Sequence, residues 1–180
     1  SWYLILHHPA PLDRVPPKIQ IQGVLRTAAT LVGEKIVSLP NSDTGSVTFL
    51  KEIEKYRGKA SMHMFGTMPR KDFLNLFKYV TLLVGNSSMG IIDSSFFKIP
   101  TVNVGNRQLG REHGVNVVHA GYDEASIRLA IKKATRPFFL RHVNRMRSPY
   151  GDGRASARIV RHIEHLINHK DLFYKKLTYV

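Results

Sequence analysis

The chain has 180 residues, the size of one domain, and 43% of them are hydrophobic, which is enough to bury an ordinary core and excludes a disordered chain. It has no cysteine and no apolar run near the roughly 18 to 20 residues of a membrane helix, so disulfides, thiolate chemistry and membrane helices are excluded and a cytoplasmic protein is expected. Its 27 Lys and Arg against 13 Asp and Glu give a net charge of +14, which predicts affinity for phosphates, nucleic acids or acidic membranes.

Short apolar runs alternate with longer segments of helical period, a pattern typical of a parallel sheet with crossover helices. Ser1 stands directly before the first apolar run, as expected of a segment cut from a longer protein. The predicted strands are, in chain order, Tyr3–His7, Lys35–Leu39, Ser61–Phe65, Thr81–Val84, Thr101–Val104 and Asn116–Val118. With no internal repeat or second domain visible, we expect a single α/β domain over residues 1–180.

Between the first two strands, apolar residues recur at spacings of three and four, which predicts a helix that starts near Pro16 and Pro17. Its buried face is predicted to consist of Ile21, Val24, Leu25, Ala28, Leu31 and Val32. Further helices are predicted at Gly45–Tyr56, Arg70–Tyr79, Met89–Phe97 and Asp123–Lys133, before basic helical segments, one of which opens at the turn Pro149–Gly153. Each strand leads into a loop and then a helix, so loops gather at the carboxyl ends of the strands, where open α/β sheets bind ligands.

The segment Val84–Asp93 passes from an apolar strand through small polar residues into a predicted helix. The first N–H groups of a helix lack internal partners and its dipole favours an anion, while serine hydroxyls add donors. Ser87 and Ser88 are therefore candidate phosphate ligands, and Gly90 would allow close approach of the backbone. Because a Ser-Ser pair is also a common helix N-cap, capping without a ligand is the alternative.

Several motifs occur in an order that resembles the UDP-N-acetylglucosamine 2-epimerases. They are GNSSMGIID (Gly85–Asp93), PTVNVG (Pro100–Gly105), RQLGRE (Arg107–Glu112) and PYGDG (Pro149–Gly153), together with HHP near the start and PNSDTGS (Pro40–Ser46). The match extends over almost the whole chain and resembles the C-terminal Rossmann-like domain of the two-domain GT-B architecture. His8-Pro9, Asn41–Asp43 and Asn86–Ser88 resemble the hydrolysing branch, whereas HRRE and DSGG stand at these positions in the non-hydrolysing branch.

The resemblance implies roles for four residues near the diphosphate and the ribose. Ser87 and Ser88 would contact the diphosphate, and Arg107 would face it as a charged donor fork. Asp93 would contact the ribose hydroxyls. The family usually has Glu at this last position, and the shorter carboxylate would miss a ribose hydroxyl by about 1.5 Å, the length of one C–C bond.

Other matching residues fall in the loops after the first three predicted strands. By resemblance, His8 would face the phosphate or the sugar, and Asn41 would help to hold the nucleotide or the sugar. Thr67 and Met68 would lie along the uracil, largely through backbone groups. Taken without the resemblance, a lone His at a strand end is structural, and Asn41 and Asp43 are ordinary turn formers.

In the family, the reaction resembles elimination of UDP across C1 and C2 of the sugar, followed by uptake of water with inversion at C2. The products are UDP and N-acetylmannosamine, which implies nucleotide-sugar metabolism of the kind that supplies sialic acid biosynthesis. This chain would support the departing diphosphate, and the acid and base that act at C2 would belong to the missing N-terminal domain. We therefore assign no catalytic residue, cofactor or metal to the chain. It alone is expected to bind UDP weakly without turnover, and the intact enzyme is expected to be a homo-oligomer.

Alternatives remain for the basic stretch. Nine Lys or Arg lie between Lys132 and Arg161, with Asp152 as the only acid, which indicates a solvated helical surface or a contact with nucleic acid or membrane. The stretch also contains Phe138, Phe139 and Tyr150, as a nucleic-acid surface does; the alternative is that Phe138 and Phe139 are core anchors. The alternatives for the whole chain are therefore the nucleotide half of a GT-B glycosyltransferase, and a basic nucleic-acid-binding module on an inactive sugar-nucleotide fold.

Two further groups of polar residues were candidates for chemistry. His162, His165 and His169 have helical spacings that could gather imidazoles around a metal, or they form an exposed flank beside the apolar face of their helix. The acids Asp13, Asp43 and Asp152 form no evident acid–base pair in the sequence.

Overall fold

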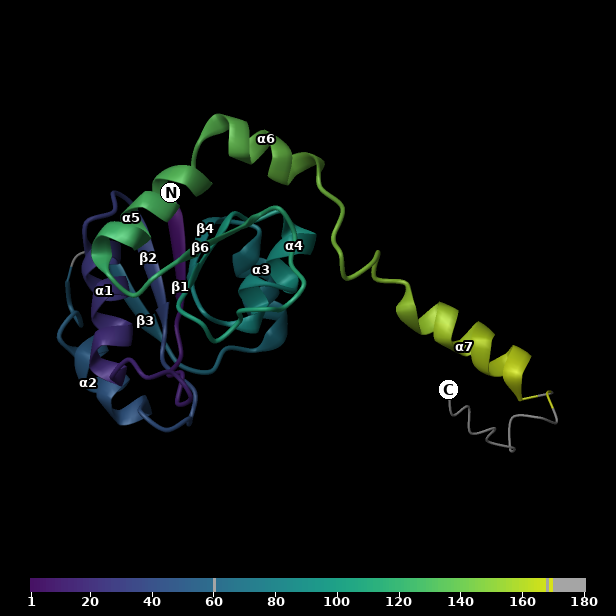
Figure 1. Cartoon of the computed structure of the whole chain (residues 1–180), viewed down its shortest axis with the longest axis horizontal. Helices are drawn as coiled ribbons and strands as arrows, with labels where there is room; N and C mark the ends of the chain where they lie inside the picture. Colours follow the sequence, from purple (N-terminus) through teal and green to yellow (C-terminus); the bar gives the residue numbers. More distant parts are fainter. Residues whose placement is uncertain (60, 168, 170–180) are drawn as a thin grey trace, which may run out of the picture. The chain divides into compact units, whose positions relative to one another are not determined.

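The computed structural model describes residues 1–59, 61–167 and 169, and the chain divides into two compact units, Ser1–Pro149 and Tyr150–Val180. The first unit contains a six-stranded sheet in the order β3-β2-β1-β4-β5-β6, and every neighbouring pair is parallel (Figure 1). The strands are β1 (Trp2–Leu6), β2 (Glu34–Ser38), β3 (Met62–Phe65), β4 (Val80–Gly85), β5 (Thr101–Val104) and β6 (Val117–Ala120). The six predicted strands and the α/β, Rossmann-like fold class are confirmed; the single domain over residues 1–180 stays a prediction.

Helices cover both faces of the sheet. The helices of this first unit are α1 (Pro17–Ala29), α2 (Ser46–Glu54), α3 (Arg70–Phe77), α4 (Asp93–Phe97), α5 (Glu124–Ala134) and α6 (Pro137–Arg145). The second unit has its own helix, α7 (Ala155–Leu166). Local chemistry determines where several of these helices begin. Helices α1 and α6 have proline in their first turn. At the start of α5, the Asp123 carboxylate accepts a hydrogen bond from the Ser126 N–H at 2.8 Å.

The core lies on both sides of the sheet, which explains why the strands are nearly continuous apolar runs. Ile5 of β1 belongs to the larger cluster, together with the buried faces of α1, α2 and α5. Leu4 and Leu6 belong to the smaller cluster on the other face, with Phe77 of α3 and Phe97 of α4. Helices α1 and α2 thus lie on one face, and α3 and α4 on the other.

The helix predicted over Met89–Phe97 is confirmed at its end and wrong at its start. The chain forms a 3-10 turn, η1 (Ser88–Gly90), and the five-residue helix α4 begins only at Asp93. The Ser94 hydroxyl donates a hydrogen bond to the Gly90 carbonyl at 2.6 Å. At the junction of η1 and α4, a side chain thus bonds to a carbonyl that would otherwise be free for a main-chain N–H.

The predicted buried face of the first helix is confirmed at four of its positions and wrong at its end. Helix α1 ends at Ala29, and Val32 is 91% exposed, while Leu31 packs only partly against the core. The reason is the turn at Gly33, which has a φ of +132° and lies where a Cβ would be 2.4 Å from the Ser1 carbonyl oxygen. The chain must therefore leave the helix before this close approach to the start of β1.

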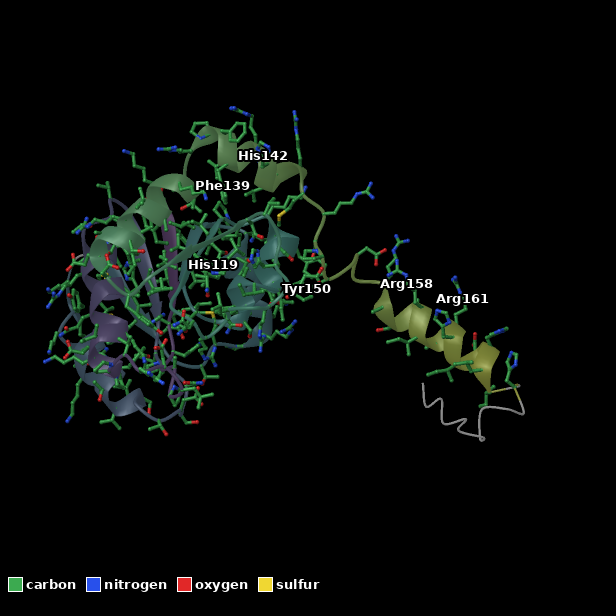
Figure 2. The ribbon with its side chains drawn as sticks, in the orientation of Figure 1. His119, Phe139, His142, Tyr150, Arg158 and Arg161 are labelled. Atoms are coloured by element: carbon green, nitrogen blue, oxygen red, sulfur yellow. The ribbon has the colours of Figure 1, made fainter. Side chains whose placement is uncertain are left out.

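The second unit contains α7 and the end of the PYGDG motif. Asp152 forms an ion pair of 2.6 Å with Arg158 and accepts a hydrogen bond from the Arg154 N–H at 3.0 Å, which orders the start of the helix. Figure 2 shows Arg158 and Arg161 on α7. Within the described ranges, no helix is both long enough and apolar enough to cross a membrane.

The three histidines near the end of the chain do not gather as a metal site. The Nε2 atoms of His165 and His169 are 3.3 Å apart, but no group of three or more metal-ligating side chains occurs among the described residues. His162 and His165 are exposed, in agreement with the alternative of a solvated flank.

Candidate functional site

The loops after β1 and β4 diverge to opposite faces of the sheet, because α1 follows β1 on one face and α4 follows β4 on the other. Such a switch point opens a crevice at the carboxyl edge of the sheet, where α/β proteins bind ligands. A cavity of about 310 Å³ lies there, which we call the β1–β4 cavity. It is lined by Leu6, His8, Ser38, Phe65, Gly66, Met68, Arg70, Phe73, Ser87 and Met89.

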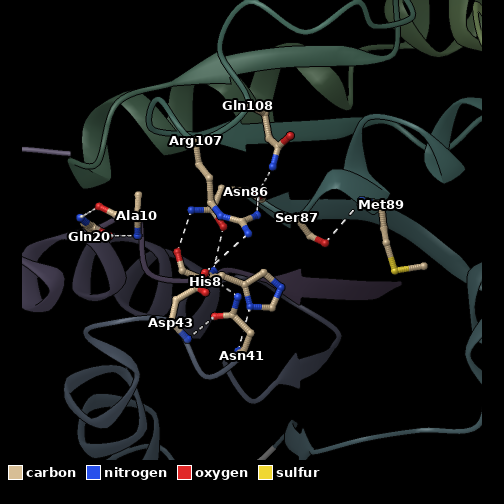
Figure 3. Close-up of polar contacts among 10 residues, drawn as sticks. All are labelled: His8, Ala10, Gln20, Asn41, Asp43, Asn86, Ser87, Met89, Arg107 and Gln108. Atoms are coloured by element: carbon tan, nitrogen blue, oxygen red, sulfur yellow. Dashed lines mark hydrogen bonds and ion pairs between the residues drawn. The ribbon is translucent and has the colours of Figure 1, made fainter. Parts of the chain in front are cut away.

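Asn86 joins three loops at this edge (Figure 3). Its side chain is fully buried; Oδ1 accepts a hydrogen bond from the His8 N–H at 2.8 Å, and Nδ2 donates to the His8 carbonyl at 2.8 Å. Its carbonyl accepts from Arg107 Nη1 at 3.1 Å and from Gln108 Nε2 at 2.8 Å. The loops after β1, β4 and β5 are therefore held together through one buried residue.

The protonation state of His8 follows from its contacts. Its Nδ1 accepts a hydrogen bond from the Asn41 N–H at 3.3 Å, so in the neutral ring the proton is on Nε2. Burial lowers the pKa of this imidazole, and the positive charge of Arg107 lowers it further, while Asp43 opposes both effects. Near neutral pH, His8 thus offers an uncharged N–H donor at the wall of the cavity.

Asp43 is more than a turn former, because it connects two candidate ligands. Its carboxylate accepts a hydrogen bond from Asn41 Nδ2 at 2.6 Å and lies 3.7 Å from Arg107 Nη2. The carboxylate and the Asn86 carbonyl together hold the Arg107 guanidinium from two sides. This fixes a half-buried cation beside His8.

Five of the predicted site residues do not line the cavity: Asn41, Thr67, Ser88, Asp93 and Arg107. Ser88 begins η1, Asp93 begins α4 and both are half-buried, whereas Thr67 is exposed between two residues that do line the cavity. Ser87 lines the cavity and also caps η1, since its hydroxyl accepts from the Met89 N–H at 3.4 Å. The proposed helix dipole at Ser88 lacks its helix, because η1 is only three residues long.

Sequence reasoning missed several residues of this site. Arg70 and the ring pair Phe65–Phe73, whose centroids are 6.2 Å apart, line the cavity from β3 and α3. Arg70 carried a usable signal, a cation in the first turn after a predicted strand. Asn86 and Gln108 lie within the motifs GNSSMGIID and RQLGRE, but nothing in the local sequence predicts that the Gln108 side chain contacts the Asn86 carbonyl.

A second cavity of about 550 Å³ is lined by residues 10–14, Asn106 and Arg107. Asp13 is fixed at its wall by hydrogen bonds from Tyr122 Oη at 2.8 Å and Asn106 Nδ2 at 3.3 Å. Burial and this carboxylate raise the pKa of Tyr122, so its hydroxyl stays protonated and donates. Arg107 lines this second cavity and not the β1–β4 cavity, and Arg14 is a further cation at the second cavity.

Comparison with known proteins shows the family of the chain. Residues 1–164 match the model of the family described as UDP-N-acetylglucosamine 2-epimerase. The UDP-N,N'-diacetylbacillosamine 2-epimerase (hydrolyzing) of Legionella pneumophila is 28% identical over 176 residues, which are 98% of this chain and 46% of that protein. The UDP-N-acetylglucosamine 2-epimerase of Neisseria meningitidis serogroup B is 36% identical over 108 residues, 59% of this chain and 28% of that protein.

Among solved structures, the S. aureus MnaA–UDP complex superposes with a TM-score of 0.71 at 18% identity, covering 100% of this chain and 48% of that one. This likeness concerns the fold. The chain spans about half the length of the relative that it matches from end to end. Because the family model covers residues 1–164 of 180, the chain belongs to the UDP-N-acetylglucosamine 2-epimerase family.

Proposed function

We propose that this chain binds the UDP part of a UDP-linked N-acetylhexosamine in the β1–β4 cavity. One observation carries the proposal: the buried Asn86 side chain and carbonyl bring His8, Ser87 and Arg107 together at the switch point of the sheet. Two of these groups offer N–H donors and one offers a hydroxyl, which suits the oxygen atoms of a diphosphate.

The proposed orientation places the diphosphate next to Arg107 and His8, with Ser87 and Ser88 as further donors. The base then lies along Gly66–Met68, near the ring pair Phe65–Phe73, which offers apolar surface at the far wall of the cavity. In this orientation, Asp93 at the start of α4 is the candidate contact of the ribose hydroxyls. Asn41 acts through His8, because its N–H fixes the imidazole tautomer.

For the intact protein, we propose the reaction of a hydrolysing 2-epimerase. The C2–H bond and the C1–O bond to UDP break while a C1=C2 double bond forms; water then supplies a hydroxyl to C1 and a proton to C2 from the opposite face. Negative charge grows on the departing diphosphate, and Arg107 and the His8 Nε2–H are placed to stabilise it. The groups that move the proton at C2 belong to the part of the protein outside this chain.

The sugar has two candidates. UDP-N-acetylglucosamine follows from the family, while UDP-N,N'-diacetylbacillosamine follows from the Legionella pneumophila relative, which aligns with 98% of this chain. The two sugars differ in part by an acetamido group at C4, which points away from the diphosphate. Release of UDP from each substrate by the intact protein, measured at equal concentrations, identifies the preferred sugar.

Calorimetric titration of the chain with UDP in 0.15 M salt tests the binding proposal. Arg107→Gln should weaken UDP about tenfold or more, because a charge-assisted contact with phosphate contributes roughly 1.5–3 kcal/mol. Arg111→Gln is the matched control, since Arg111 is exposed and lines neither cavity, and it should leave the affinity unchanged. Equal affinities in both variants, or displacement of UDP by a short RNA, would contradict the proposal.

A further inference from the structure

A third cavity, of about 600 Å³, lies against α6 and shares no lining residue with the β1–β4 cavity or with the second cavity. Its walls are α6, residues 146–149 and the loop 113–115; we call it the α6 pocket. The loop leads into the amino end of β6, whereas the β1–β4 cavity lies at the carboxyl ends of the strands. The α6 pocket is therefore separate from the site proposed for UDP.

The lining of the α6 pocket is strongly positive. Arg141, Arg145 and Arg147 line it together with His113 and His142, and its lining contains no Asp or Glu. No ion pair joins any of the three arginines to a carboxylate within residues 1–59, 61–167 and 169. Three uncompensated guanidinium groups around one concave surface repel each other, and a bound anion would relieve that repulsion.

Contacts outside the pocket hold its walls in place. Lys98 Nζ donates a hydrogen bond to the Asn144 carbonyl at 2.6 Å, and the hydroxyls of Ser95 and Ser148 are 2.6 Å apart. Val143 of α6 is 1% exposed, so this helix is anchored to the first unit through a buried side chain. The pocket is thus preformed, and a ligand would not have to order it.

Several side chains of the pocket are also oriented. His142 Nδ1 donates to the Phe138 carbonyl at 2.9 Å, and the two rings lie 4.3 Å apart between centroids. The Arg141 guanidinium lies 5.9 Å from the centre of the same Phe138 ring. Phe138 is 65% exposed, so its prediction as a core anchor is wrong, whereas Phe139 packs partly against the larger core cluster. The exposed ring instead supports two polar side chains of the pocket wall.

Of the nine Lys and Arg between Lys132 and Arg161, six belong to the first unit and three to the second. Three of them line the α6 pocket, and Arg154, Arg158 and Arg161 belong to the second unit, where Arg158 is paired with Asp152. A polynucleotide needs a continuous basic groove. Three guanidinium groups that line one concave, preformed site suit a compact group with several phosphoryl oxygens.

We propose that the α6 pocket binds the di- or triphosphate group of a small molecule through Arg141, Arg145 and Arg147. The proposal rests on this pocket alone and does not depend on the function proposed for the β1–β4 cavity. His113 and His142 complete the lining as further donors to phosphate oxygens.

An NMR titration of the ¹⁵N-labelled full chain with inorganic pyrophosphate, and separately with ATP, tests the proposal in 0.15 M NaCl. Saturable shifts are expected at the amides of Val115, Val143 and Met146, while Gly66 and Ser87 report independently on the β1–β4 cavity. The double variant Arg141→Gln/Arg145→Gln should weaken the first set of shifts about tenfold or more. Both side chains are exposed, so the variant is expected to fold.

Lys132→Gln/Lys133→Gln is the matched control, because it removes the same charge from α5, outside the pocket lining. It should leave the affinity unchanged, and Arg147→Gln alone should weaken it about threefold or more, as loss of one phosphate contact. Equal losses in both double variants, shifts that do not saturate, or shifts only at Gly66 and Ser87 would overturn the proposal. Tighter binding of an RNA octamer than of ATP at the same amides would overturn it in favour of nucleic acid.

Discussion

Replacing His7 with phenylalanine tests whether a buried imidazole makes this fold sensitive to acid. His7 is 1% exposed, and neither ring nitrogen has a hydrogen-bond partner in the described part of the chain. The ring stacks on Phe49 with centroids 5.6 Å apart and meets the edge of Tyr122 at 6.2 Å. Burial, followed by the charge of His8, lowers its pKa to about 3 from the ordinary 6.5.

The direction of the pH effect follows from this difference. Below pH 6.5, His7 becomes protonated in the unfolded chain but stays neutral in the folded chain down to about pH 3. The stability of the fold is therefore fully present above pH 6.5 and is lost as the pH falls toward 3. The slope is about 1.4 kcal/mol per pH unit, which amounts to about 2 kcal/mol between pH 6.5 and pH 5. His7→Phe removes this slope. It also replaces an unsatisfied polar ring with an apolar one of similar shape, which should add about 1 kcal/mol at neutral pH.

Urea unfolding at pH 7.5 and pH 5.0 measures both effects. The free energy of unfolding should fall by about 2 kcal/mol less in His7→Phe than in the wild type. Ile53→Val is the control: it removes a buried methyl group from the core cluster that contains Phe49 and should cost about 1 kcal/mol at both pH values without changing the slope. Parallel pH dependences of the wild type and His7→Phe would refute the reasoning.

Three further predictions concern the loops and glycines around the site. Asn86→Ala leaves the His8 N–H and carbonyl without their buried partners and should lower the free energy of unfolding in urea by about 2–4 kcal/mol. A loss below about 0.5 kcal/mol would show that these two hydrogen bonds do not hold the loops together. Gly85→Ala should lower the thermal stability more than Gly151→Ala. A Cβ at Gly85 would lie 2.0 Å from a carbonyl oxygen of β1, whereas Gly151, also at positive φ, faces open space. Equal losses of stability in the two variants would show that only backbone strain matters. Asp43→Asn removes the carboxylate 3.7 Å from Arg107 and should tighten UDP about two- to fivefold by calorimetry, whereas weaker binding would mean that Asp43 orients the guanidinium more than it competes for it.

Much of the fold was predictable because buried parallel strands are apolar runs bounded by polar loops. The errors occur where a local feature overrides the period. Val32 continues the apolar spacing of α1, but the helix ends at Ala29, before Val32, because the chain turns at Gly33. The pattern over Met89–Phe97 is helical, yet it breaks at the junction where Ser94 bonds the Gly90 carbonyl.

The candidate site was predictable only in part. Motif order pointed to His8, Asn41, Ser87 and Arg107, and the structure places all four around the same crevice. The role of Asn86 was not visible, because its partner His8 is 78 positions away in the sequence and local patterns carry no information on such pairs. The α6 pocket could not be predicted for the same reason, since a stretch rich in Lys and Arg does not show which of these residues line one pocket.

A crystal structure of the chain with UDP tests the central claim most directly. The account predicts the uracil beside Gly66–Met68 and a phosphate oxygen within hydrogen-bond distance of His8 Nε2 and the Arg107 guanidinium. UDP bound elsewhere, such as in the α6 pocket alone, or with its phosphates remote from both His8 and Arg107, would contradict the account.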